Sequence, residues 1–107
     1  MNKKILGIIG GGQLGMFTCI AAKKIGLKTV VFSTERQFSA KKFCDEYVIS
    51  EFVDQNNSNK FFDLADFFTI ETENIPIDFL KKIKKKLLPS LNIIEIAQNR
   101  LKEKKYL

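Results

Sequence analysis

The first third of the chain shows a continuous apolar run followed by a helical stripe. Ile5–Ile9 is apolar or glycine throughout and ends in further glycines, as a strand covered on both faces of a parallel sheet does. Between positions 13 and 25 apolar residues recur at helical spacing, and Gly26 stands where a helix end is expected. The stripe comprises Leu14, Phe17, Ala21 and Ile25. With a second strand predicted at Lys28–Phe32, this order indicates the opening of a doubly wound sheet.

The rest of the chain has weaker patterns. Glu46–Ser50 and Asp66–Ile70 predict a third and a fourth strand, and Ser33–Lys42 predicts a loop that passes into a short helix. A run of polar residues within Asp54–Lys60 predicts a loop, with at most a weak helix after it. Pro76 suits the first turn of a further helix. The inner face of that helix is expected to hold Ile77, Leu80, Ile83 and Leu87.

Together these elements predict one α/β domain with a Rossmann-like, three-layer parallel sheet. The expected strand order is 3-2-1-4 with right-handed crossovers. Leu87–Ser90 is expected to form a short fifth strand or a turn, and Leu91–Gln98 a short helix. A length of 107 residues with 45% hydrophobic residues is enough for a single ordinary core.

The positive charge is concentrated near the carboxyl-terminal end. Residues 1–80 carry nine Lys/Arg against ten Asp/Glu, whereas residues 81–107 carry nine against two. A basic end can bind nucleic-acid phosphates, but no aromatic residues are interleaved with the lysines of Lys81–Lys86. We therefore expect a solvated helix face and no nucleic-acid partner.

Three features predict a soluble cytoplasmic protein without a metal site. Cys19 and Cys44 are far apart, and the chain has no histidine, so a zinc site is not expected. Two lone cysteines without a signal peptide fit a reducing cytoplasm, where they serve as small core residues. No apolar run approaches the roughly 20 residues of a membrane span.

A glycine-rich turn directly follows the first predicted strand and opens the first helix. Its sequence, Gly10-Gly11-Gly12-Gln13-Leu14-Gly15, matches GxGxxG. Glycines permit close backbone approach, and the helix N-terminus offers unpaired N–H groups and partial positive charge to an anion. Gln13 adds an amide suited to a sugar or a phosphate. A tight crossover without any ligand is the alternative interpretation of this turn.

A free-standing binding module is the alternative to an enzyme. NAD sites usually place Asp or Glu at the end of the second strand, where this chain has Ser33. Arg36 is instead suited to a 2′-phosphate. A Rossmann module that binds NADP or a sugar phosphate therefore remains open.

Three motifs, in order along nearly the whole chain, resemble N5-carboxyaminoimidazole ribonucleotide synthases. Ile8–Gly15 looks like the opening of that family, and Ile70–Pro76 resembles its acidic motif, in which two glutamates precede Asn-hydrophobic-Pro. Glu95–Lys104 resembles the segment that leaves the first domain. The resemblance implies a pre-ATP-grasp domain at residues 1–98 and an exit segment at residues 99–107. The ATP-grasp domain itself is expected to lie outside this chain.

The resemblance implies a ligase of purine biosynthesis. Such enzymes use ATP, Mg2+ and bicarbonate to carboxylate 5-aminoimidazole ribonucleotide, and their first domain forms one wall of the substrate site. The glycine turn is then expected to face the ribose phosphate, Glu71 and Glu73 the ribose hydroxyls, and Arg100 is expected to reach ATP. The implied substrate-binding residues are Gly10, Gly11, Gly12, Gln13, Leu14, Gly15, Glu71 and Glu73.

The same resemblance implies that the segment holds no catalytic residue or metal ligand and is inactive alone. It also makes a homodimer of the full-length enzyme a candidate assembly. Met16 stands where the family usually has Arg, and Ser33 where it often has Asp. The two glutamates as solvated strand-end residues, and Arg100 as an ordinary surface charge, are the simpler alternatives. A sister ligase that formylates glycinamide ribonucleotide generally has Glu where this chain has Gln13.

Overall fold

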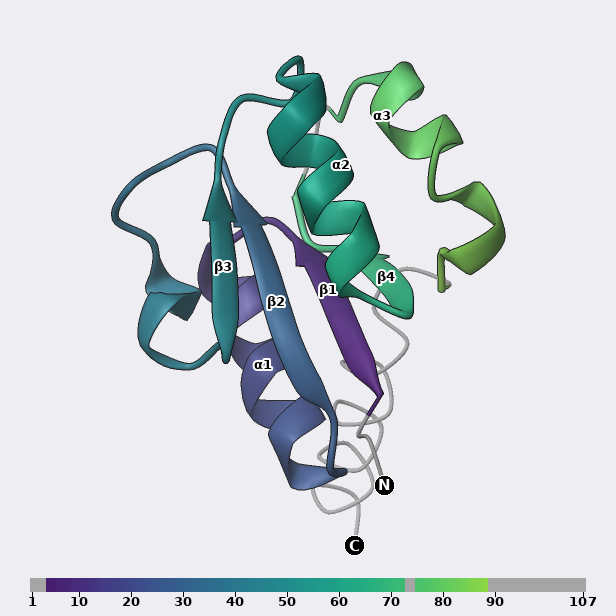
Figure 1. Ribbon diagram of the computed structural model, residues 1–107. Helices are drawn as coiled ribbons and strands as arrows, with labels where there is room; N and C mark the ends of the chain where they lie inside the picture. Colours follow the sequence, from purple (N-terminus) through teal and green to yellow (C-terminus); the bar gives the residue numbers. More distant parts are fainter. Residues whose placement is uncertain (1–3, 73–74, 89–107) are drawn as a thin grey trace, which may run out of the picture.

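The computed structural model describes residues 4–72 and 75–88 of the chain. Four parallel strands form one sheet in the order β3-β2-β1-β4, which confirms the predicted α/β fold (Figure 1). β1 pairs with β2 from Ile5↔Lys28 to Ile9↔Phe32, and with β4 from Leu6↔Phe67 to Ile9↔Ile70. The strands are β1 (Ile5–Ile9), β2 (Lys28–Ser33), β3 (Glu46–Ile49) and β4 (Phe67–Ile70).

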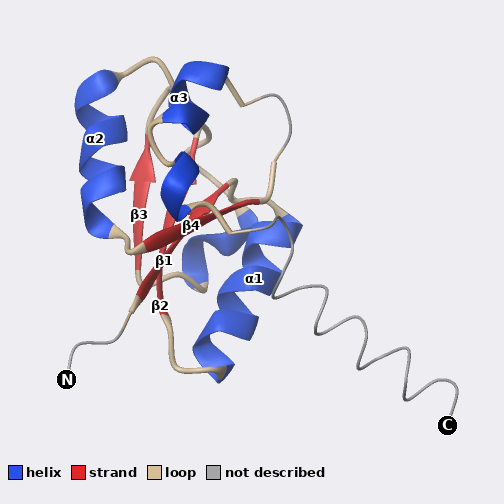
Figure 2. Ribbon diagram, turned by 90° about the vertical axis from the view of Figure 1, so that its right-hand side faces the viewer, coloured by secondary structure: helices blue, strands red, loops and turns tan. Residues whose placement is uncertain are grey.

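Helices cover both faces of the sheet, as the three-layer prediction requires. α1 (Gln13–Lys24) lies on one face, while α2 (Gln55–Leu64) and α3 (Ile77–Lys81) lie on the other (Figure 2). A 3-10 turn at Ser39–Lys42 follows β2, and a second at Lys84–Lys86 follows α3. Alternation along β1 sends Leu6 and Ile8 toward α1 and Ile9 toward α2.

Phenylalanines dominate the core between the sheet and α2. The ring of Phe32 lies 5.3, 5.2 and 5.1 Å from the ring centroids of Phe52, Phe61 and Phe79 respectively. Aromatic rings at such distances contribute more than their buried area alone. This cluster fixes the end of β2, which borders the candidate site.

The predicted inner stripe of α1 is wrong. Leu14, Phe17 and Ile25 are 47%, 52% and 65% exposed. The buried residues of α1 are instead Gly15, Thr18, Cys19 and Ala22. The side chains on the buried face are small because the helix lies close to the sheet. A Cβ at Gly15 would come 2.2 Å from the Gly10 carbonyl oxygen.

Two other helices also differ from the sequence prediction. The polar run expected as a loop forms most of α2, because the Asp54 side chain caps it by accepting from the Asn57 N–H at 3.0 Å. α3 does begin after Pro76, but Ile77 is 70% exposed and Phe79 takes the buried position. Ile83 is buried as predicted, whereas Leu80 and Leu87 are half-buried.

The expected short fifth strand appears within the described ranges as one parallel bridge. Leu87 pairs with Phe68 of β4, and the Leu88 N–H donates to the Phe68 carbonyl at 2.8 Å. The predicted helix at Leu91–Gln98 and the boundary between residues 98 and 99 lie outside the described residues.

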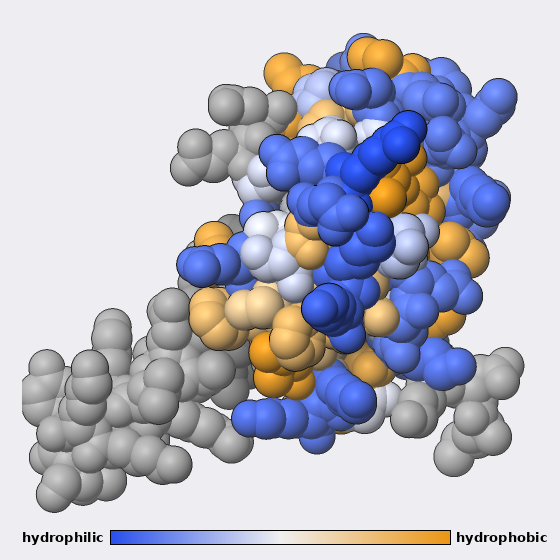
Figure 3. Space-filling model, turned by 90° about the vertical axis from the view of Figure 1, so that its left-hand side faces the viewer, coloured by the Kyte–Doolittle hydropathy of each residue, from blue (hydrophilic) through white to orange (hydrophobic). Residues whose placement is uncertain are grey.

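The edge of the sheet at β3 is mostly polar at its surface (Figure 3). Phe43 and Tyr47 are exposed there, among charged residues. No helix in residues 4–72 and 75–88 is long and apolar enough to cross a membrane.

Candidate functional site

The glycine turn lies at the carboxyl ends of β1, β2 and β4. Gly10 has φ +116°, a conformation that L side chains rarely adopt, and its N–H donates to the Phe32 carbonyl at 2.9 Å. A Cβ at Gly10 would come 2.8 Å from the Glu71 carbonyl oxygen. The structure thus brings the glycine turn and the start of the acidic motif together, at the point where open α/β sheets bind ligands.

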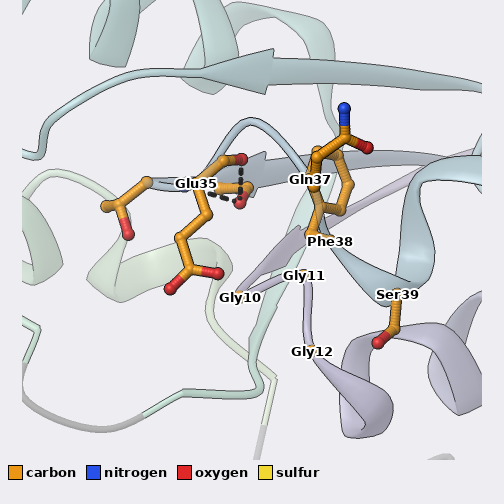
Figure 4. A pocket seen from close by; sticks show the side chains of 9 residues that line it. Gly10, Gly11, Gly12, Glu35, Gln37, Phe38 and Ser39 are labelled. Atoms are coloured by element: carbon orange, nitrogen blue, oxygen red, sulfur yellow. Dashed lines mark hydrogen bonds between the residues drawn. The ribbon is translucent and has the colours of Figure 1, made fainter.

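A pocket of about 520 Å³ opens beside the turn. Its walls are Gly10–Gly12 and the loop that follows β2 (Figure 4). Glu35 and Ser39 stand on either side of the turn in this view, and Phe38 packs against Gly11. Sequence reasoning missed these loop residues. The signal for them was their place directly after a strand that ends at the same sheet edge.

The first turn of α1 has backbone donors available for an anion. Gly12 is the N-cap, no side chain caps the helix, and the first N–H to reach the Gly12 carbonyl is that of Met16 at 2.9 Å. The N–H groups of the three residues between them have no intrahelical acceptor. A Cβ at Gly12 would meet nothing within 4 Å, so the approach is open. Gln13 and Leu14 lie exposed in this turn, outside the walls of the pocket.

The side chains that line the pocket supply no positive charge. None of its lining residues is Lys or Arg, and Glu35 is its one acidic lining residue. Met16, where the resemblance led us to expect Arg, is half-buried and packs against the core cluster that contains Leu6 and Ile8. Attraction of an anion therefore depends on the N–H groups of the turn and the dipole of α1.

Glu71 lies beside the turn, but its carboxyl points toward α1. The residue is 7% exposed, and its Oε1 lies 3.1 Å from the Thr18 hydroxyl oxygen. Oε2 has no hydrogen-bond partner within the described part of the chain. Burial raises the pKa of this carboxyl above its ordinary value, and the hydroxyls of Thr18 and Thr69 partly oppose that shift.

The predicted contacts to substrate stay predictions. Glu71 is not among the residues that line the pocket. Glu73 and Arg100 lie outside the described residues.

The dinucleotide alternative gains no support from the end of β2. Ser33 is buried, and its hydroxyl donates to the Glu35 carbonyl at 2.9 Å and accepts from the Glu35 N–H at 3.0 Å. Its hydrogen bonds are therefore used within the loop. Arg36 is not among the lining residues of the pocket.

The cysteines belong to the core. Cys19 is fully buried, and burial raises its pKa to about 12. Cys44 is half-buried against the same cluster, and burial raises its pKa as well. Neither is a reactive thiolate at neutral pH. Among the described residues, no group of three or more His, Cys, Asp or Glu is placed to hold a metal ion.

Comparison with known proteins gives a consistent family. Residues 2–98 match the family described as the ribonucleotide synthetase preATP-grasp domain. Over its whole length the chain is 34% identical to a phosphoribosylaminoimidazole carboxylase of Candida albicans, and the match covers 19% of that protein. Over 95% of its length the chain is 33% identical to an N5-carboxyaminoimidazole ribonucleotide synthase of Staphylococcus epidermidis, and the match covers 28% of that protein.

A solved structure extends this similarity to three dimensions. The N5-carboxyaminoimidazole synthetase of Staphylococcus aureus, determined in complex with ADP, superposes with a TM-score of 0.73 at 31% identity. The match covers 98% of this chain and 30% of that protein. The chain thus spans less than a third of the length of these relatives.

Proposed function

Because this chain belongs to the ribonucleotide synthetase pre-ATP-grasp domain family, we propose that it is the substrate-side domain of an ATP-grasp ligase. The ligase carboxylates the exocyclic amine of 5-aminoimidazole ribonucleotide, using ATP and bicarbonate, and releases the N5-carboxy nucleotide, ADP and phosphate. The names of the Staphylococcus relatives support this reaction.

The observation that carries the proposal is the open N-terminus of α1 beside the pocket. The phosphate of the nucleotide is held by the N–H groups after Gly12, where nothing obstructs close approach. The Gln13 amide extends the same edge and hydrogen-bonds the phosphate or the ribose. The pocket between the turn and the loop after β2 receives the remainder of the nucleotide.

The domain binds and orients the nucleotide substrate, and the phosphoryl transfer takes place in another part of the full-length enzyme. ATP, with Mg2+, supplies the phosphoryl group that activates bicarbonate in the full-length enzyme, and the ADP complex of the Staphylococcus aureus relative supports such a site. Arg100 is proposed to reach ATP from the exit segment, residues 99–107. Residues 1–98 form the domain proper, and the segment alone is proposed to be inactive. A homodimer of the full-length enzyme and a cytoplasmic location belong to the same proposal.

A domain exchange tests the proposal inside a complete relative. Residues 1–98 replace the corresponding segment of the Staphylococcus epidermidis synthase, and ADP formation is measured with bicarbonate, with and without 5-aminoimidazole ribonucleotide. We expect nucleotide-dependent turnover, which a chimera carrying Gly12→Val loses. The proposal is contradicted if a folded chimera binds ADP but forms it at the same rate with and without 5-aminoimidazole ribonucleotide.

A further inference from the structure

The Thr18 hydroxyl faces two hydrogen-bond acceptors and has a single proton. Its oxygen lies 2.9 Å from the Leu14 carbonyl oxygen, one helical turn back, and 3.1 Å from Oε1 of Glu71. If the proton goes to the closer Leu14 carbonyl, an ionised Glu71 has no donor to accept from at this contact. A protonated Glu71 removes the conflict, because its O–H then donates to the Thr18 oxygen.

The burial of Glu71 also disfavours a charge. The residue is 7% exposed, and Oε2 lacks a partner among the described residues. An ionised carboxylate prefers several donors, and the donors near this one in the described part of the chain are the hydroxyls of Thr18 and Thr69, so burying the charge here is costly. A neutral carboxylic acid carries a far smaller penalty for the same unpaired oxygen.

No charged group that faces Glu71 compensates for its burial. From α1 the group that faces the carboxyl is the Thr18 hydroxyl, and from β4 it is the Thr69 hydroxyl. Gly10 of the glycine turn approaches the main-chain carbonyl of Glu71. The upward shift in its pKa arises from burial, without a contribution from a neighbouring charge in the described part of the chain.

We propose that Glu71 is an uncharged positioning residue that donates a hydrogen bond to Thr18 and so fixes the first turn of α1 against the end of β4. The connection runs from Glu71 through the Thr18 hydroxyl to the carbonyl of Leu14, inside the turn whose N–H groups face the anion. The binding of an anion there, and its identity, rest on the function proposed above.

A neutral Glu71 also suits a neighbouring phosphate. Ionisation adds a negative charge near the bound anion and repels it. It also removes the donor that holds Thr18. Both effects weaken anion binding as the pH rises, and this role differs from direct contact with ribose hydroxyls, which needs an exposed acceptor.

The first test needs no ligand. The side-chain carboxyl of Glu71 is titrated by carbon-13 NMR in the 107-residue chain, while the amide resonances of Gly10–Gly15 are followed. We expect a midpoint above the ordinary value of 4.5, with the amides of the turn moving at that same midpoint. The inference is overturned if the midpoint lies at or below 4.5, or if the amide resonances of the turn do not shift at that midpoint.

The second test uses Glu71→Gln, which copies a protonated glutamate in shape and retains a donor. The free energy of unfolding of the wild type contains a contribution that is full below pH 4.5 and is lost as the pH rises through the raised pKa. Glu71→Gln lacks that loss, so it gains stability relative to the wild type as the pH rises. Glu46→Gln, at an exposed position on β3, is the matched control. A stability difference between Glu71→Gln and the wild type that stays constant with pH contradicts the inference.

Binding of 5-aminoimidazole ribonucleotide separates a positioning residue from a ligand of the sugar. On raising the pH through the Glu71 midpoint, we expect the wild-type Kd to rise by about threefold relative to that of Glu71→Gln, the size expected for one charge at a helix terminus. Thr18→Val weakens binding and Thr18→Ser restores it. If Glu71→Gln weakens binding equally at every pH and Thr18→Val does not, Glu71 contacts the substrate directly and the inference is overturned. If nothing binds but the turn still titrates with Glu71, the proposed function fails and the positioning role stands.

Discussion

The backbone of Gly10 lies directly against that of Glu71, close enough that a Cβ on Gly10 would come 2.8 Å from the Glu71 carbonyl oxygen. The contact joins the turn after β1 to the end of β4. Together with the hydrogen bond from the Gly10 N–H to Phe32, it locks the turn between the two strands that flank β1. The backbone of the turn is therefore held by contacts to both neighbouring strands.

Gly10→Ala is expected to destabilise the fold. The substitution forces an L residue to φ +116° and brings its Cβ against backbone atoms, which costs about 1–3 kcal/mol for the conformation alone. Gly12→Ala is the control, because φ there is −73° and the added Cβ has open space. Urea unfolding of both variants measures the difference. Equal midpoints for the two variants contradict this account of the turn.

Gly12→Val is expected to leave the fold intact and to block the ligand. The Cβ meets no protein atom, so the branched side chain occupies the space through which the phosphate approaches the N–H groups. We expect the Kd for 5-aminoimidazole ribonucleotide to rise at least about tenfold, equivalent to about 1.4 kcal/mol. Calorimetry measures binding, and circular dichroism confirms folding. Unchanged affinity places the phosphate elsewhere.

Much of the fold could be predicted from the sequence because its strongest signals are local. The run Ile5–Ile9 and the glycines after it specify a buried strand and a sharp turn, and both lie where predicted. The buried face of α1 could not be predicted by hydrophobicity. Close packing of α1 on the sheet selects Gly15, Thr18 and Ala22 for size, and leaves larger apolar side chains outside.

The candidate site was predicted only in part for the same kind of reason. The motif identified the glycines, but the loop residues of the pocket carry no motif, and Glu35 and Phe38 reach it through tertiary structure. The polar composition of α2 does not indicate a helix. The helix forms because Asp54 caps its N-terminus and Phe61 is buried in the core. No sequence pattern indicated that the carboxyl of Glu71 would be buried against Thr18.

Met16→Arg is expected to strengthen anion binding. Position 16 follows the turn by one residue, and the long stem of arginine can cover the apolar surface that Met16 now covers while its head reaches solvent. One added charge near a bound phosphate is worth on the order of 1 kcal/mol, and salt weakens it. Binding measured at two ionic strengths tests this against Met16→Leu. A gain that does not depend on salt contradicts the electrostatic explanation.

The two cysteines are expected to differ in reactivity. Burial raises the pKa of Cys19 to about 12 and leaves it without solvent contact, so it alkylates only when the protein unfolds. Cys44 is half-buried and reacts first, although slowly, because its pKa is raised too. Mass spectrometry after timed iodoacetamide treatment at about pH 8 distinguishes the sites, with Cys44→Ser as the control. Rapid native labelling of Cys19 contradicts the packing described for α1.

The most direct test of the central claim compares two nucleotides on the same chain. 5-Aminoimidazole ribonucleotide and NADP are titrated side by side at equal ionic strength, and the amide resonances of Gly12, Gln13 and Leu14 are followed by NMR. A ribonucleotide site predicts saturable shifts of these amides with 5-aminoimidazole ribonucleotide, lost in Gly12→Val, and none with NADP. Saturable shifts with NADP and none with 5-aminoimidazole ribonucleotide would contradict the proposed function and identify a dinucleotide-binding module instead.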